Sequence, residues 1–223
     1  MTTLDIQSEV GQFVAEKPSV SRIFEKYGID YCCGGRQSLA EACQAKGLEA
    51  NEVLAEVRQA LRGPADLDLQ QLSPAQLVEH IVARYHGYLR ETFPMLTHQV
   101  DRVAMVHGPN RPELLEVRRV YHAFMREMLS HMEKEETILF PMIASQADTN
   151  ALRRMIGVME AEHDEAGDAL ARMRSLTNNY AIPEGACGTY RAVLRGLAEL
   201  EQDTHLHVHA ENHVLFPRAL VCR

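Results

Sequence analysis

The chain has 223 residues, of which 46% are apolar and 24% charged, as in an ordinary soluble globular protein with one or two domains. Its net charge of -8 argues against the basic face that binding to nucleic acid or to an anionic membrane surface requires. No secretion signal and no membrane-spanning apolar run occurs, so we expect a cytoplasmic protein that binds neither nucleic acid nor membrane.

The first part of the chain, residues 1–62, predicts a small helical domain. Four short helical segments are expected, at residues 5–16, 18–27, 36–46 and 50–61. Pro18, the sequence YGIDYCCGG and Gly47 separate them. No run alternates apolar and polar residues as a half-buried strand would. The stretch 62–74, RGPADLDLQQLSP, contains two prolines and a glycine, and residues 63–73 are predicted to be a linker.

The remainder, residues 74–223, predicts an up-down-up-down four-helix bundle. Four long segments have helical periodicity, at residues 74–107, 112–146, 149–178 and 183–221. Long helices joined by short breaks are typical of a bundle in which neighbouring helices are antiparallel. We expect Pro94, Pro141 and Pro217 to kink their helices or to end them early. The whole chain therefore predicts an all-α protein.

One motif occurs twice in the bundle, as HMEKEETILFP from His131 and as HVHAENHVLFP from His207. Each copy has a His, three residues, a Glu, three residues and then Leu-Phe-Pro. The spacing puts His131 and Glu135 one turn apart on one helix face, and does the same for His207 and Glu211. Both pairs lie in apolar stripes, where a carboxylate is costly unless a charge offsets it. A multivalent cation between the two carboxylates is therefore predicted.

Two further histidines, His86 and His163, lie on apolar stripes of the other two helices. Each precedes one copy of the motif by nearly the same distance, so the bundle is predicted to consist of two equivalent helical hairpins. Six ligands are too many for one tetrahedral zinc. Bridging carboxylates with a bridging oxide or hydroxide would hold two ions and leave an open position on each, and these ligands favour iron, then manganese. The predicted metal ligands are His86, His131, Glu135, His163, His207 and Glu211.

Other polar residues of the bundle have less specific patterns. Glu127 and Asp203 each precede a ligand histidine by one turn, and either orient its ring or are solvated charges. The remaining histidines of the fourth helix are predicted to lie at the surface or around the ligands; these are His205, His209 and His213. Four more are predicted to be exposed or hydrogen-bonded, namely His80, His98, His107 and His122.

The adjacent cysteines Cys32 and Cys33 are the second chemical signal. They could close only a strained ring, so an ordinary structural disulfide between them is not expected. The two glycines that follow predict accessible thiols, and a helix beginning near Arg36 would favour thiolate. Such a pair could bind a soft metal, carry electrons or exchange disulfides. The alternative is that both are small packing residues before a turn.

These residues resemble a known family, the iron-sulfur cluster repair di-iron proteins, which have a short ScdA-type N-terminal domain and a hemerythrin-like bundle. The segment YGIDYCCGG is similar to the N-terminal signature, and the six predicted ligands are similar to the pattern of the bundle. Hemerythrins proper are a looser match, because they use a fifth histidine. The resemblance implies a stress-response factor that restores iron-sulfur clusters after nitrosative or oxidative damage, by supplying iron from a labile di-iron site. Damaged iron-sulfur proteins would then be its partners.

Two other functions remain open at this point. One is a sensor or scavenger that binds NO or O2 at the predicted open positions. The other is an oxidoreductase that reduces NO while Cys32 and Cys33 relay electrons. Repair ranks first and enzymatic turnover last. For the assembly, a homodimer is one option.

Overall fold

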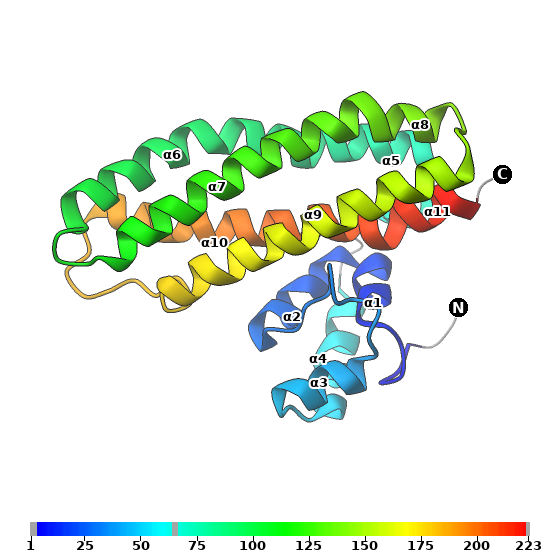
Figure 1. The fold of residues 1–223 in the computed structure, drawn as a ribbon. Coiled ribbons are helices and arrows are strands. Elements are labelled where there is room, and N and C mark those ends of the chain that lie inside the picture. The colour runs from blue at the N-terminus through cyan, green and yellow to red at the C-terminus, as the bar shows by residue number, and fades with distance from the viewer. Residues whose placement is uncertain (1–3, 64–66, 222–223) are drawn as a thin grey trace. The chain divides into compact units, whose positions relative to one another are not determined.

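The computed structural model describes residues 4–63 and 67–221, and helices make up most of them (Figure 1). An isolated antiparallel bridge between Glu9 and Ser38 is the strand-like pairing found among these residues. The prediction of an all-α protein is confirmed. The contacts divide the chain into two compact units. Unit 1 consists of the residues up to Glu79 together with those from His205 onward, and unit 2 is His80–Thr204.

Unit 1 contains short helices from both ends of the chain. They are α1 (Val10–Glu16), η1 (Pro18–Val20), α2 (Ser21–Tyr27), α3 (Leu39–Lys46), α4 (Ala50–Leu61), η2 (Leu69–Gln71), α5 (Pro74–His80), η5 (Ala210–Leu215) and α11 (Phe216–Val221). Their shared apolar core includes Phe13, Phe24, Tyr31 and Leu39, and Val208 from the C-terminal part of the chain joins the same core.

Two predicted starts in unit 1 were wrong. The first helix begins at Val10 rather than residue 5, because Asp5 and Ser8 close a turn before it. The third begins at Leu39 rather than residue 36, because Ser38 is its N-cap and forms a capping box with Glu41. The predicted linker is partly helical: residues 64–66 lie outside the described residues, whereas Leu69–Gln71 form the 3-10 turn η2.

Unit 2 is a four-helix bundle. Its helices are η3 (Ile81–His86) continuing into α6 (Gly87–His107), α7 (Glu113–Lys134) continuing into η4 (Glu135–Leu139) and α8 (Phe140–Ala144), α9 (Thr149–Leu176), and α10 (Gly188–His209) as far as Thr204. The fourth helix begins at Gly188 rather than residue 183, because a turn from Pro183 to Ala186 precedes it. Aromatic and aliphatic residues from all four helices form one buried core.

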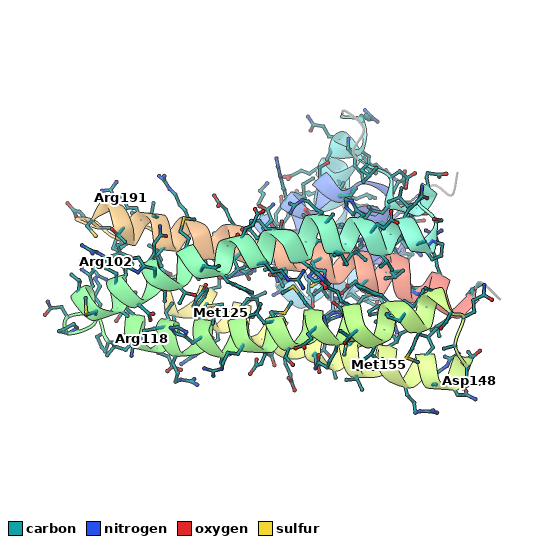
Figure 2. The ribbon with its side chains drawn as sticks, turned by 90° about the horizontal axis from the view of Figure 1, so that it is seen from above. Arg102, Arg118, Met125, Asp148, Met155 and Arg191 are labelled. Atoms are coloured by element: carbon teal, nitrogen blue, oxygen red, sulfur yellow. The ribbon has the colours of Figure 1, made fainter. Side chains whose placement is uncertain are left out.

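The two ends of the bundle carry different residues (Figure 2). Arg102, Arg118 and Arg191, from three different helices, lie at one end, whereas Asp148 lies toward the other (Figure 2). There the Asp148 carboxylate accepts hydrogen bonds from the backbone N–H groups of Asn150 and Ala151, the second and third residues of α9, and caps the helix. Met125 lies between the helices and packs against the core.

Among the described residues, three π-helical segments interrupt the long α-helices, and each carries a predicted metal ligand. His86 ends η3, Glu135 begins η4, and Glu211 is the second residue of η5. The two copies of the repeated motif have the same backbone pattern: the N–H of the Phe in Leu-Phe-Pro bonds to the carbonyl of the Glu five residues earlier. Short π segments of this kind are frequent at functional sites.

Two of these segments are followed by a proline at the same position. Pro141 and Pro217 are each the second residue of the short helix that comes next, α8 or α11, where the missing N–H of proline is tolerated. Pro94 does not end its helix, because α6 continues through it to His107, and a kink at this position stays a prediction.

Candidate metal centre

Four of the predicted ligands come together inside unit 2. His86 comes from the first helix of the bundle, His131 and Glu135 from the second, and His163 from the third. Each side chain is at most 2% exposed. Three helices therefore direct imidazole and carboxylate groups into one buried region.

The ligand atoms are close to one another. The Oε2 atom of Glu135 lies 3.2 Å from Nε2 of His86 and 3.3 Å from Nε2 of His131. The Nε2 atoms of His131 and His163 are 3.1 Å apart. Ligand atoms bound to one octahedral ion at roughly 2.1 Å are separated by about 3 Å, so this spacing suits metal coordination. The Oε2 atom of Glu135 thus adjoins histidines from two different helices.

The Glu135 carboxylate gives a test of whether a cation fits. It is completely buried, and neither of its oxygen atoms accepts a hydrogen bond from any described residue. A buried, ionised carboxylate without a hydrogen bond costs several kcal/mol or more. A bound cation would remove that cost, and the nearby nitrogen atoms are ligands that transition metals accept. The residues present therefore fit a metal ion.

Two glutamates contact the Nδ1 atoms of His86 and His131 and so orient the two rings. Nδ1 of His86 lies 2.6 Å from Oε1 of Glu136, and Nδ1 of His131 lies 2.9 Å from Oε2 of Glu162. A carboxylate accepts only, so each Nδ1 carries the proton and each Nε2 presents its lone pair toward Glu135. This is the tautomer that a metal-binding histidine requires.

The same contacts keep both glutamates ionised. Burial opposes the charge of Glu136, but hydrogen bonds from His86 and Arg90 outweigh it, so the pKa of Glu136 is lower than usual. Burial likewise opposes the charge of Glu162, and Lys134 and His131 lower its pKa. Sequence reasoning missed both residues, although each is the immediate neighbour of a predicted ligand, Glu136 after Glu135 and Glu162 before His163.

The other two predicted ligands belong to unit 1. His207 lies on the last turns of α10 and Glu211 lies in η5, and both side chains are completely buried. Nε2 of His207 is 3.2 Å from Oε1 of Glu211. The spacing of the motif thus produces the expected His-Glu pair on one helix face.

The two acids that precede the repeated histidines differ from each other. Asp203 is 7% exposed, and its carboxylate accepts a hydrogen bond of 2.6 Å from Arg84. Glu127 is exposed on α7 and lines a cleft of about 210 Å³ between α7 and α9, which His131 and Glu162 also line. The repeat therefore does not give these two positions the same surroundings.

The adjacent cysteines occupy a tight loop in unit 1. The carboxylate of Asp30 accepts hydrogen bonds from the backbone N–H groups of Cys32, Cys33 and Gly34, and from the Cys32 thiol at 3.2 Å. Asp30 as a whole residue is exposed, but the loop packs around its carboxylate, and this desolvation opposes the charge. The hydrogen bonds outweigh the desolvation and lower the pKa of Asp30 below its usual value.

Cys32 does not have the exposed, thiolate character that the sequence predicted. Its side chain is buried, and the adjacent Cys33 thiol, burial and the Asp30 charge raise the pKa of Cys32 well above the usual value. The predicted cause is also missing, because the next helix begins at Leu39, well after the loop. Cys33 is partly exposed.

Three residues from the C-terminal part of unit 1 hold this loop. His209 donates to the carbonyl of Tyr31, and His213 and Asn212 both donate to the carbonyl of Cys32, with His213 at 2.8 Å. His209 is buried, which with the neighbouring His213 lowers the pKa of His209 to about 3. The prediction that His209 is a surface histidine or a neighbour of the ligands is therefore replaced by a structural role in the loop.

None of the described helices is long and apolar enough to cross a membrane. Residues 77–219 match the family described as hemerythrin HHE cation binding domain, and residues 6–61 match ScdA_N, described as a domain of unknown function.

Full-length relatives extend the comparison to the whole chain. The iron-sulfur cluster repair protein YtfE of Escherichia coli O1:K1 is 41% identical over 212 residues, which cover 95% of this chain and 96% of the relative. The protein of the same name from Escherichia fergusonii has the same identity and coverage. That from Enterobacter sp. strain 638 is 39% identical over 211 residues, again 95% of this chain and 96% of the relative. The chain thus belongs to the family of iron-sulfur cluster repair proteins that join an ScdA_N domain to a hemerythrin HHE cation binding domain.

Proposed function

We propose that this protein restores damaged iron-sulfur clusters by supplying iron from a di-iron centre. The observation that carries the proposal is the buried Glu135 carboxylate, which accepts no hydrogen bond from a described residue and adjoins the Nε2 atoms of His86 and His131. A purely structural core would not retain such a group, because its burial is costly without a cation. The similar proteins described above are named iron-sulfur cluster repair proteins, which supports this role.

The proposed ligands are His86, His131, Glu135, His163, His207 and Glu211. All six lie within the stretch that matches the HHE cation binding domain. His207 and Glu211 repeat the local geometry of His131 and Glu135, including the π turn that follows. With Glu135 and Glu211 as bridges and an oxide or hydroxide between the ions, the set suits two irons.

The ligand chemistry also supports release of iron. Four of the six proposed ligands are imidazoles, which are neutral, and histidine and carboxylate hold iron less tightly than a thiolate cage does. Glu136 and Glu162 hold the tautomer of His86 and His131 through Nδ1, so these rings bind through Nε2. Bound iron would supply both the ion for a cluster and a change of oxidation state.

The test is a transfer assay without oxygen. Protein purified anaerobically should contain two irons per chain, and it should restore an enzyme whose iron-sulfur cluster has been damaged by NO. The control receives the same amount of free ferrous iron in place of the protein. Both reactions contain a chelator that binds any iron released into solution. Recovery no greater than with that control would reject iron donation, whatever the iron content.

A second candidate is reversible binding of NO or O2. The cleft beside His131 favours it, because a small molecule can approach this side of the proposed centre from solvent. Spectral titration of the reduced iron form with each gas decides this candidate, and no change would reject it. Reduction of NO with relay through Cys32 and Cys33 ranks third, since Cys32 is buried and its thiol protonated.

The proposed repair function implies that damaged iron-sulfur proteins are the partners. For the domains, we propose a helical domain at residues 1–62, a linker at residues 63–73 and a helical bundle at residues 74–223. A cytoplasmic location and a homodimer stay predictions.

A further inference from the structure

We propose that Asp30, Cys32 and Cys33 form a second metal site, which binds one thiophilic cation such as Zn²⁺ and is separate from the six histidine and glutamate ligands. Their ligand atoms lie within 4.8 Å of one another. The three residues belong to unit 1, and this site is independent of the proposed repair function.

The spacing of the sulfur atoms suits one ion. The Sγ atoms of Cys32 and Cys33 are 3.8 Å apart. Two sulfur ligands of a tetrahedral zinc, each bound at about 2.3 Å, are separated by roughly the same distance. Oδ1 of Asp30 is 3.2 Å from Sγ of Cys32, so the carboxylate adjoins this edge. Three protein ligands would leave the fourth position of a tetrahedral ion for solvent.

The loop is already held in the shape that the site needs. The carboxylate of Asp30 accepts three backbone N–H groups at 2.8 to 3.0 Å, which fixes the carboxylate against the two cysteines. On the other side, the Cys32 carbonyl accepts hydrogen bonds from His213 and Asn212. Gly35 has no space for a Cβ, which would meet the Tyr31 carbonyl at 2.3 Å and His213 at 2.6 Å. A preformed site loses little conformational entropy on binding.

The negative charge of Asp30 favours the metal-bound form of the two cysteines over their protonated, metal-free form. Asp30 places a negative charge beside both sulfur atoms, and that charge now accepts the Cys32 S–H. Binding of Zn²⁺ would break two S–H bonds, form two Zn–S bonds and release two protons to solvent, with no change of oxidation state. Asp30 is exposed and Cys33 partly exposed, so an ion can reach the loop from solvent although Cys32 is buried.

Ligand softness separates this site from the proposed iron centre. Thiolates select zinc or copper(I), whereas the ligands in the bundle are imidazoles and carboxylates without sulfur. A thiolate bond is therefore a spectroscopic signature of the loop alone.

The experiment uses iron-loaded, full-length protein without oxygen, and Co²⁺ as the probe. Wild-type protein should develop the near-ultraviolet thiolate-to-cobalt absorption, saturating at one ion per chain, and Zn²⁺ should abolish it. The absorption should be lost in Cys32→Ser and in Cys33→Ser, with the iron content unchanged. The matched control is Cys187→Ser, which removes an exposed cysteine of unit 2 and should retain the full signal.

Two further measurements keep the result decisive if a variant folds poorly. Zn²⁺ should protect Cys33 of the wild-type protein from alkylation while Cys187 still reacts, as mass spectrometry would report. Asp30→Asn should bind Co²⁺ more weakly, and equal affinity would remove the carboxylate from the site. Folded wild-type protein without the thiolate-to-cobalt absorption, or a Cys33→Ser variant that retains it, would overturn the proposal.

Discussion

Glu162 on α9 contacts His131 on α7, because its Oε2 atom lies 2.9 Å from Nδ1 of that histidine. The contact fixes the proton on Nδ1 and leaves Nε2 as the ligand atom. The same carboxylate also binds Lys134, so Glu162 is held from two sides. The orientation of one proposed ligand therefore depends on a residue of another helix.

The first prediction tests this support. Glu162→Gln removes the charge that favours the Nδ1–H tautomer, so iron affinity should fall by about 10- to 100-fold. Competition with a chelator of known affinity measures the change. Glu165→Gln is the matched control, because Glu165 is exposed on the same helix and lines the same cleft. Equal loss in both variants would mean that the general charge of the cleft matters and not the contact with His131.

The second prediction concerns the unpartnered carboxylate of Glu135. In metal-free protein Glu135→Gln should raise the free energy of unfolding by about 2 kcal/mol, because the buried charge is removed. With iron present the order should reverse, since a wild-type protein at 100 times its dissociation constant gains about 2.7 kcal/mol from binding.

Thermal unfolding with and without iron measures both effects of Glu135→Gln. The control is Glu133→Gln, on an exposed position two residues earlier in the same helix, which should change neither midpoint. A variant less stable than wild type in both conditions would contradict the idea that Glu135 is retained for a cation.

The third prediction concerns the proline of the repeated motif. Pro141→Ala supplies an N–H that can bond in the α-helical pattern, which competes with the π turn in which Phe140 N–H bonds to the Glu135 carbonyl. Glu135 would then turn away from His86 and His131, and iron affinity should fall about 10-fold, as for other misoriented ligands.

The control for Pro141→Ala is Pro94→Ala, because α6 runs through Pro94 without a π turn beside it. Chelator competition on both variants compares them. An unchanged affinity in Pro141→Ala would show that the π turn persists without the proline.

The fourth prediction concerns the packing of His213 in unit 1. A Cβ on Gly11 would lie 2.6 Å from Nδ1 of His213, so Gly11→Ala should destabilise the protein by about 1 to 3 kcal/mol. Gly157→Ala is the matched control, because nothing lies within 4 Å of its added Cβ and it is exposed inside a helix. That variant should gain about 0.5 to 1 kcal/mol.

Chemical unfolding measures both glycine variants, and the double variant with Gly11→Ala and His213→Ala should recover part of the loss. No recovery would assign the cost to the backbone of α1 and not to the contact with His213.

Helical periodicity was sufficient to predict most of the long helices and the candidate ligands, because residues one turn apart on a helix share a face whatever surrounds them. His131 and Glu135 illustrate this, and so does the pair of His207 and Glu211. The first bundle helix spans residues 74 to 107 in three consecutive segments, as its periodicity predicts. Local turn chemistry also explains the errors at helix starts, since the Ser38 cap delays the third helix to Leu39.

Such local patterns could not predict contacts between segments that are far apart in the sequence. Glu162 precedes the proposed ligand His163 in the sequence, but which histidine it contacts depends on how two helices pack. Likewise, the burial of Cys32 depends on the packing of unit 1, and the carbonyl of Cys32 accepts a hydrogen bond from His213, which lies 181 residues further along the chain.

By itself, therefore, the sequence determined most of the helices and the faces on which the proposed His and Glu ligands lie, because local backbone geometry sets both. Only the tertiary structure decided which carboxylates orient those ligands, which thiol is buried and which glycines have no room for a side chain. These properties depend on distances between groups that chain folding brings together, and no local pattern encodes such distances.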